Sequence, residues 1–122
     1  MQKPQLVLIA GPYRSGTGGD PDAIARNLAR LEEAAAPIYR LGHIPMIGEW
    51  IALPILRGMS QQETATEDVM YATASRILQH CDAVLRLPGE SAGADTDVAI
   101  ARERGIPVYH HLDEIPALQP QA

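Results

Sequence analysis

The stretch Ala83-Val-Leu-Arg-Leu-Pro-Gly-Glu-Ser-Ala-Gly-Ala-Asp-Thr-Asp97 indicates the fold more clearly than any other part of the chain. Its apolar start, residues 83–87, is typical of a buried strand, and the Pro/Gly/Ser loop that follows leads into a helix expected over 97–104. In an open parallel α/β sheet, ligands bind where the strands reach their carboxyl ends. The sequence therefore predicts that this loop borders a site for a polar small molecule, phosphorylated or not.

The same alternation of strands and helices runs along the rest of the chain. We expect a strand at 6–10, and a long amphipathic helix that Asp20 and Pro21 begin and Gly42 ends. The other expected elements are a strand at 43–47 near a sheet edge, a loop with one short helix at 48–62, a helix from Thr64 or Thr66 to Gln79, strands at 82–87 and 106–110, and a helical turn at about 113–118. This order predicts an α/β three-layer sandwich with a parallel sheet of four to five strands.

Composition limits the classes of protein to which the chain can belong. It has 122 residues and a formal net charge of -5, so we expect one domain over residues 1–118 with a disordered tail at 119–122. No Lys/Arg cluster points to a nucleic acid polymer or an anionic membrane, and no apolar run approaches membrane-spanning length. The single cysteine, Cys81, favours a reducing cytoplasm.

A glycine-rich loop, residues 11–19, follows the first strand. Its glycine spacing matches neither a Walker loop nor a dinucleotide fingerprint. Arg14 in this loop is placed to hold a phosphate or a sugar hydroxyl, although a solvated arginine on a surface loop fits the composition equally well.

The residues around the start of the helix expected at 97–104 allow two interpretations. Asp95 or Thr96 can simply cap that helix, with Ser91 and Gly93 as ordinary turn residues before it. Alternatively, Asp97 is a carboxylate nucleophile for an anomeric carbon, kept ionised by the positive end of the helix.

Other residues that suggest chemistry carry less weight. Glu49 and Trp50 follow the second strand and so border the same end of the sheet, where Trp50 is placed to stack on a base. The adjacent His110 and His111 have no third ligand at a suitable spacing, so we expect no metal. Nothing in the sequence calls for a cofactor.

Four segments together resemble the nucleoside 2-deoxyribosyltransferase-like family, in particular its short bacterial and phage branch. They are Ile9-Ala-Gly-Pro-Tyr13, Gly42-His-Ile-Pro45, Cys81-Asp-Ala-Val-Leu-Arg-Leu-Pro-Gly89, and Ser91-x-Gly-Ala-x-x-Asp97 continued by Ala101-x-x-x-Gly-Ile-Pro-Val108. The resemblance covers residues 5 to 110. It implies a flavodoxin/Rossmann-like sheet, homo-oligomerisation, and hydrolysis or transfer of an N-glycosidic bond in a nucleoside or nucleoside 5′-monophosphate.

The resemblance also implies roles for individual residues. The position of Asp97 usually holds a glutamate, the nucleophile that carries the sugar, and Ser91 and Gly93 match the loop that holds the 5′-hydroxyl or 5′-phosphate. Tyr13 and Arg14 match the loop that closes over the ligand. We therefore expect catalytic roles for Asp97 and Tyr13. The resemblance and the positions of residues at the same end of the sheet together give the expected substrate-binding residues, which are Gly11, Pro12, Arg14, Ser91, Gly93, Asp95 and Trp50.

Two departures from the family pattern leave a second class of function open. Aspartate is one methylene shorter than glutamate, and the family's second acid has no counterpart in the stretch 71–75, with Asp68 nearly two turns away. The alternative to an N-glycosidase or 2-deoxyribosyltransferase is thus a weakly active or inactive module that binds a nucleotide-like ligand. In either case we expect a homodimer or larger oligomer, with the apolar segment 50–59 near the interface.

Overall fold

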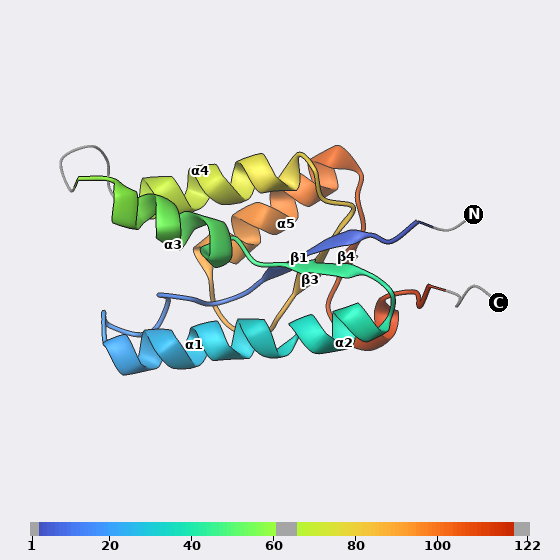
Figure 1. Cartoon of the computed structure of the whole chain (residues 1–122), viewed down its shortest axis with the longest axis horizontal. Coiled ribbons are helices and arrows are strands. Elements are labelled where there is room, and N and C mark those ends of the chain that lie inside the picture. Colours follow the sequence, from blue (N-terminus) through green and yellow to red (C-terminus); the bar gives the residue numbers. More distant parts are fainter. Residues whose placement is uncertain (1–2, 61–65, 119–122) are drawn as a thin grey trace.

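The computed structural model describes residues 3–60 and 66–118. Four parallel strands form one sheet in the order β2-β1-β3-β4. They are β1 (Leu6–Ala10), β2 (Ile44–Met46), β3 (Ala83–Arg86) and β4 (Val108–Tyr109). Helices cover both faces of the sheet, with α1 and α2 below it and α3, α4 and α5 above it in Figure 1. The predicted three-layer α/β sandwich of the flavodoxin/Rossmann-like kind is therefore confirmed.

The strand order places a topological switch point between β1 and β3. The chain runs from β1 outward to β2, then crosses to β3 on the other side of β1. β2 pairs only with β1 among the described strands, as expected for an edge strand that contains Pro45, which has no N–H to donate. In open α/β sheets, the crevice at such a switch point is where ligands bind, outside the carboxyl ends of the strands.

The first helical segment is divided in two, where one helix to Leu41 was predicted. α1 (Pro21–Glu33) begins as expected, with Asp20 accepting from the amide of Ala23, but α2 (Ala35–Arg40) is a separate helix. Pro37 explains the break, because it has no N–H to donate to the carbonyl four residues earlier. Gly42 follows the end of α2 with φ of 94°, a left-handed conformation that suits glycine.

The segment expected to be a loop with one short helix is mostly helical. α3 spans Glu49–Gly58 and begins directly after β2, and Pro54 lies inside it. The side chain of Ala52 is completely buried, so the helix is held by packing rather than by a side-chain cap. The prediction underestimated this helix because Pro54 and Gly58 are ordinarily helix breakers.

The next helix, α4 (Thr66–Leu78), agrees with the prediction from Thr66 onward, and the alternative start at Thr64 lies outside the described residues. α5 spans Ala92–Arg104 and therefore begins five residues before the predicted start at Asp97. Its N-cap is Ser91, whose Oγ accepts from the amide of Ala94 at 3.1 Å. Asp95 and Thr96 are therefore not caps, and Thr96 instead donates to the carbonyl of Ala92.

The remaining predicted strands and the final turn are present but shorter. The structure gives 44–46, 83–86 and 108–109 where 43–47, 82–87 and 106–110 were predicted, and a 3-10 turn at Leu112–Glu114 replaces the expected turn at 113–118. The predicted tail at 119–122 lies outside the described residues. Each described helix is too short or too polar to cross a lipid bilayer.

Candidate functional site

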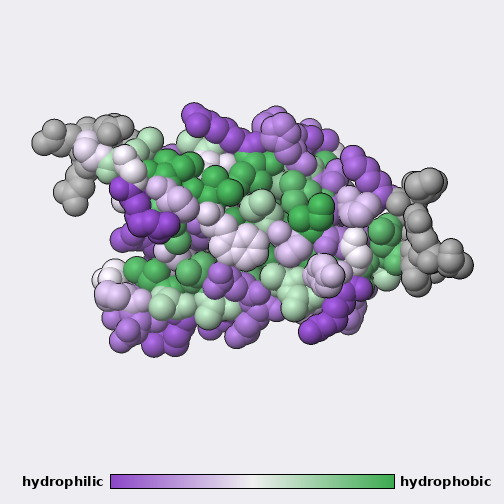
Figure 2. Space-filling view, in the orientation of Figure 1, coloured by the Kyte–Doolittle hydropathy of each residue, from purple (hydrophilic) through white to green (hydrophobic). Residues whose placement is uncertain are grey.

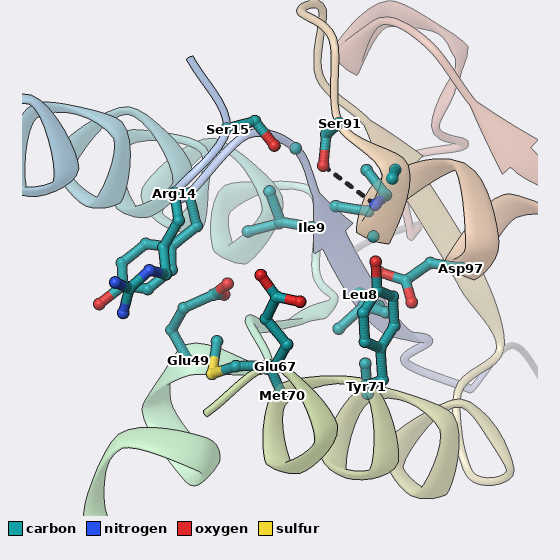
Figure 3. Close-up of a pocket in the computed structure, with 18 residues that line it drawn as sticks. Leu8, Ile9, Arg14, Ser15, Glu49, Glu67, Met70, Tyr71, Ser91 and Asp97 are labelled. Atoms are coloured by element: carbon teal, nitrogen blue, oxygen red, sulfur yellow. Dashed lines mark hydrogen bonds between the residues drawn. The ribbon is translucent and has the colours of Figure 1, made fainter. Parts of the chain in front are cut away.

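A cavity of about 420 Å³ opens at the carboxyl end of β1, on the face of the sheet covered by α3, α4 and α5. Leu8, Ile9 and Ala10 of β1 form its floor, and the loop after β1 and the start of α5 border it. The cavity therefore lies at the switch point between β1 and β3, where this class of sheet binds ligands. Figure 3 shows the side chains that point into it.

Asp97 projects into this cavity from the second turn of α5. Burial, and then the charge of Glu49, raise the pKa of the Asp97 carboxyl to about 7, against a weaker lowering by Arg86. The sequence predicted the opposite effect, a carboxylate kept ionised by the helix N-terminus. That expectation was wrong because α5 begins earlier, which moves Asp97 away from the terminal amides and into a partly buried position.

A second carboxylate, Glu49, enters the cavity from the first residue of α3. Burial raises its pKa as well, and its charge in turn raises the pKa of the Tyr13 hydroxyl, where burial is the larger cause. Glu49 thus acts electrostatically on both Asp97 and Tyr13, which come from two other elements. The three side chains form one coupled group around the cavity.

Helix α4 contributes Glu67 and Tyr71, which lie one turn apart on the same side of the helix, with Met70 between them. Glu67 is exposed and Tyr71 is 41% exposed, so they border the cavity where it opens to solvent. The lining thus carries three carboxylates, those of Glu49, Glu67 and Asp97, against the one guanidinium of Arg14.

The loop between β3 and α5 is held in place by Arg86. Its guanidinium donates to the carbonyls of Leu87 and Gly89 and forms an ion pair of 3.0 Å with Asp95. Gly89 has φ of 117°, and a Cβ there would come within 2.7 Å of the Pro12 ring, so the two loops meet closely at this point. These contacts fix the position of Ser91 and Gly93 beside the cavity.

The loop after β1 packs tightly at its start. A Cβ on Gly11 would lie 3.1 Å from the side chain of Leu31 and 3.2 Å from that of Leu87, so glycine allows the chain to pass between α1 and the loop after β3. Asn27 of α1 donates to the carbonyl of Tyr13 at 2.9 Å, which ties the loop to that helix. Arg14 and Ser15 then border the cavity from above β1.

The structure brings together six of the nine residues predicted from the sequence to form the site. Those lining the cavity are Gly11, Tyr13, Arg14, Ser91, Gly93 and Asp97. Pro12 lies behind them against Gly89, Asp95 is exposed and paired with Arg86, and the indole N–H of Trp50 donates to Glu32 at 2.8 Å on the outside of α3. Trp50 is therefore not positioned to stack on a ligand in this cavity.

Several residues that line the cavity were missing from the predicted site, among them Glu49, Glu67 and Tyr71. Glu49 was noted only for bordering the sheet end, Glu67 was not considered, and Tyr71 was noted only as part of the stretch 71–75 that lacks the family's second acid. Asp68, the acid weighed instead of Glu67, is exposed and does not line the cavity. Only its position could have identified Glu49 as a site residue from the sequence. Glu49 follows β2 by three residues and so lies at the carboxyl edge of the sheet.

Comparison of the chain with protein-family models, with curated proteins and with solved structures gave no match. Within residues 3–60 and 66–118, no three His, Cys, Asp or Glu side chains gather closely enough to hold a metal ion.

Proposed function

We propose that this protein hydrolyses or transfers the N-glycosidic bond of a nucleoside or nucleoside 5′-monophosphate, with Asp97 as the nucleophile. One observation carries the proposal: a partly buried carboxylate faces a cavity at the switch point of the sheet, beside a second carboxylate and a tyrosine. Carboxylate pairs around a sugar are the usual machinery for cleaving glycosidic bonds.

The reaction has two steps. An oxygen of Asp97 bonds to C1′ while the C1′–N bond breaks and its electron pair leaves with the base. Water, or the nitrogen of a second base, then attacks C1′ and returns the bonding electrons to Asp97. Each step inverts C1′, so the overall reaction retains configuration.

Binding of the substrate follows from the two loops at the cavity mouth. Ser91 is buried and its Oγ already accepts from Ala94, which leaves its O–H free to donate to a 5′-oxygen. The hydroxyl of Tyr13 is protonated at neutral pH, and burial raises its pKa further, so this hydroxyl can donate to the sugar or to Asp97. Arg14 supplies the positive charge that a 5′-phosphate requires.

The test is release of free base from a panel of nucleosides and 5′-monophosphates. We expect turnover by the parent protein and a loss of at least about 10³-fold in Asp97→Asn, because the nucleophile is removed. Asp95→Asn is the matched control, since Asp95 lies on the same helix but outside the cavity. Unchanged turnover in Asp97→Asn would contradict the covalent mechanism. Saturable ligand binding without turnover would support the alternative of a binding module.

We further propose that the protein forms a homodimer or larger oligomer through the outer face of α3. Figure 2 shows apolar side chains gathered over α3 and α4. Those of Ile51 and Ile55 in α3, and of Met59 directly after it, are 43%, 37% and 38% exposed, and an exposed apolar patch is typical of an interaction surface. Sedimentation at micromolar concentration should give at least twice the monomer mass, and Ile55→Glu should reduce it to that of the monomer.

We also propose a cytoplasmic location. The one cysteine, Cys81, is buried, and burial is the main cause that raises its thiol pKa to about 11, which favours a reduced thiol of the kind that a reducing compartment maintains.

A further inference from the structure

Glu49 and Asp97 face the same cavity from elements that are far apart in the sequence. Glu49 is the first residue of α3, immediately after β2, and Asp97 is in the second turn of α5. Both carboxylates point into the cavity in Figure 3, and each is partly buried. Helix α4, which packs against both α3 and α5, closes the space between them.

Burial distinguishes Glu49 from the other acids nearby. Glu67 lies at the exposed mouth of the cavity, and Asp95 is exposed and held by Arg86. An acid that carries a proton at neutral pH has to be shielded from water, because solvation favours the charged form. Glu49 is partly buried, and that burial raises its pKa above the ordinary value for glutamate.

Several charged and titratable groups surround this pair. Those facing it are Tyr13 and Arg14 from the loop after β1, Glu67 and Tyr71 from α4, Arg86 from β3, and more distantly Cys81 before β3. The charge of Glu49 raises the pKa of Asp97, and Arg86 lowers it. The protonation of Asp97 therefore depends on the protonation of Glu49.

We infer that Glu49 is the general acid and base of the reaction proposed above, an inference that rests on that proposed function. The reactive form is the one in which Asp97 is ionised and Glu49 carries a proton. As the C1′–N bond breaks, the Glu49 carboxyl transfers its proton to a ring nitrogen of the departing base and becomes a carboxylate. In the second step, that carboxylate removes a proton from the attacking water, while the C1′–O bond to Asp97 breaks and Asp97 is released as a carboxylate. The catalyst returns to its starting protonation state.

Two nucleosides test whether Glu49 acts as the general acid, because the base of one needs a proton in order to leave and the base of the other does not. The base of 7-methylguanosine already carries a positive charge and leaves as a neutral molecule, whereas the base of guanosine needs a proton to leave well. We expect Glu49→Gln to slow base release from guanosine by about 10²–10⁴-fold and to slow release from 7-methylguanosine much less. Asp97→Asn should abolish release from both, and Asp68→Asn, an exposed acid outside the cavity, should alter neither.

A second measurement does not depend on turnover. The pKa of the Asp97 carboxyl, followed by NMR, should fall in Glu49→Gln, because the second-largest cause that raises it is removed. An unchanged Asp97 pKa, or an equal loss of activity toward both nucleosides, would overturn the role of Glu49 and leave the proposed function standing.

The reverse pattern, in which Asp97→Asn spares 7-methylguanosine and Glu49→Gln does not, would exchange the two roles and overturn both assignments. A parent protein that releases no base from any nucleoside would overturn the proposed function itself.

Discussion

The cores on the two faces of the sheet differ in the size of their side chains. On the face covered by α1 and α2, the core consists mainly of large aliphatic residues, which include Val7, Ile9, Leu31, Ile38 and Leu85. On the opposite face, covered by α4 and α5, three of the seven core residues are alanines, Ala10, Ala94 and Ala101. This second face opens into the cavity that holds Asp97.

This difference places most of the large stabilising side chains on one face of the sheet and the candidate site on the other. Large apolar side chains stabilise by the area they remove from water, so the α1/α2 face should provide most of the folding free energy. Small side chains on the α4/α5 face leave room for a ligand and for carboxylates whose burial is unfavourable when they are charged. Truncation of a large core residue on the α1/α2 face should therefore destabilise the protein, whereas removal of the charge of Asp97 on the other face should stabilise it.

The largest effect on stability is expected from Ile38→Ala. Ile38 lies in α2 and is fully buried, so its truncation leaves a cavity and should lower the free energy of unfolding by about 2–5 kcal/mol. Urea denaturation measures this change. Tyr39→Ala, next to it and 74% exposed, should change stability by no more than about 0.5 kcal/mol. A loss below about 1 kcal/mol in Ile38→Ala would mean that this face is not the stabilising one.

On the other face, Asp97→Asn should stabilise the protein at high pH. The pKa of Asp97 is raised in the folded state, so its favourable contribution is complete below about pH 4 and is lost as pH rises through about 7. Replacing the carboxyl should therefore leave stability unchanged at pH 4 and raise it by about 1–3 kcal/mol at pH 8. Urea unfolding at the two pH values measures this change in stability, and Asp95→Asn is the exposed control. Equal stability of Asp97→Asn and the parent protein at pH 8 would contradict the prediction.

The charge of the cavity predicts a preference between the two substrate classes. Three carboxylates and one arginine line it, so a 5′-phosphate dianion should bind less well than the neutral nucleoside. We expect kcat/KM for a nucleoside to exceed that for its 5′-monophosphate by about tenfold, which corresponds to about 1.4 kcal/mol. The preference should shrink in Glu67→Gln, which removes one negative charge at the cavity mouth. A preference for the monophosphate would show that Arg14 outweighs the carboxylates.

The smallest effect is expected at Gly93, in the first turn of α5. A Cβ there would meet Tyr71 at 3.8 Å, an ordinary contact, so Gly93→Ala should fold and gain up to about 0.5–1 kcal/mol of stability. The added methyl lines the cavity, so KM should rise. Gly105→Ala is the opposite control, because Gly105 has φ of 73° and alanine should destabilise there. A stabilised Gly93→Ala with unchanged KM would place the substrate elsewhere.

Apolar runs and helix signals were sufficient to predict the layered fold and the edge position of β2. The errors arose where two local rules compete. Pro37 divided a helix whose periodicity continued through it, and α3 formed despite Pro54 because its inner face is buried. Such outcomes depend on tertiary packing, which the sequence of a single segment does not contain.

The site was predicted in part for a similar reason. Ser91, Asp95 and Thr96 are all suitable N-caps, and only the structure identifies Ser91 as the one used. With the helix beginning at Ala92, Asp97 falls on the same side as the buried Ala94 and Ala101, which explains its partial burial. Glu49 could not be assigned, because its approach to Asp97 depends on how α3 packs across α4.

The most direct test of this account is the titration of Asp97 in the parent protein, followed by NMR of its carboxyl carbon. We predict a pKa of about 7, because the carboxyl lies partly buried in the cavity beside Glu49. A pKa near 4, the ordinary value for aspartate, would show that this carboxyl faces bulk water and would contradict the central claim.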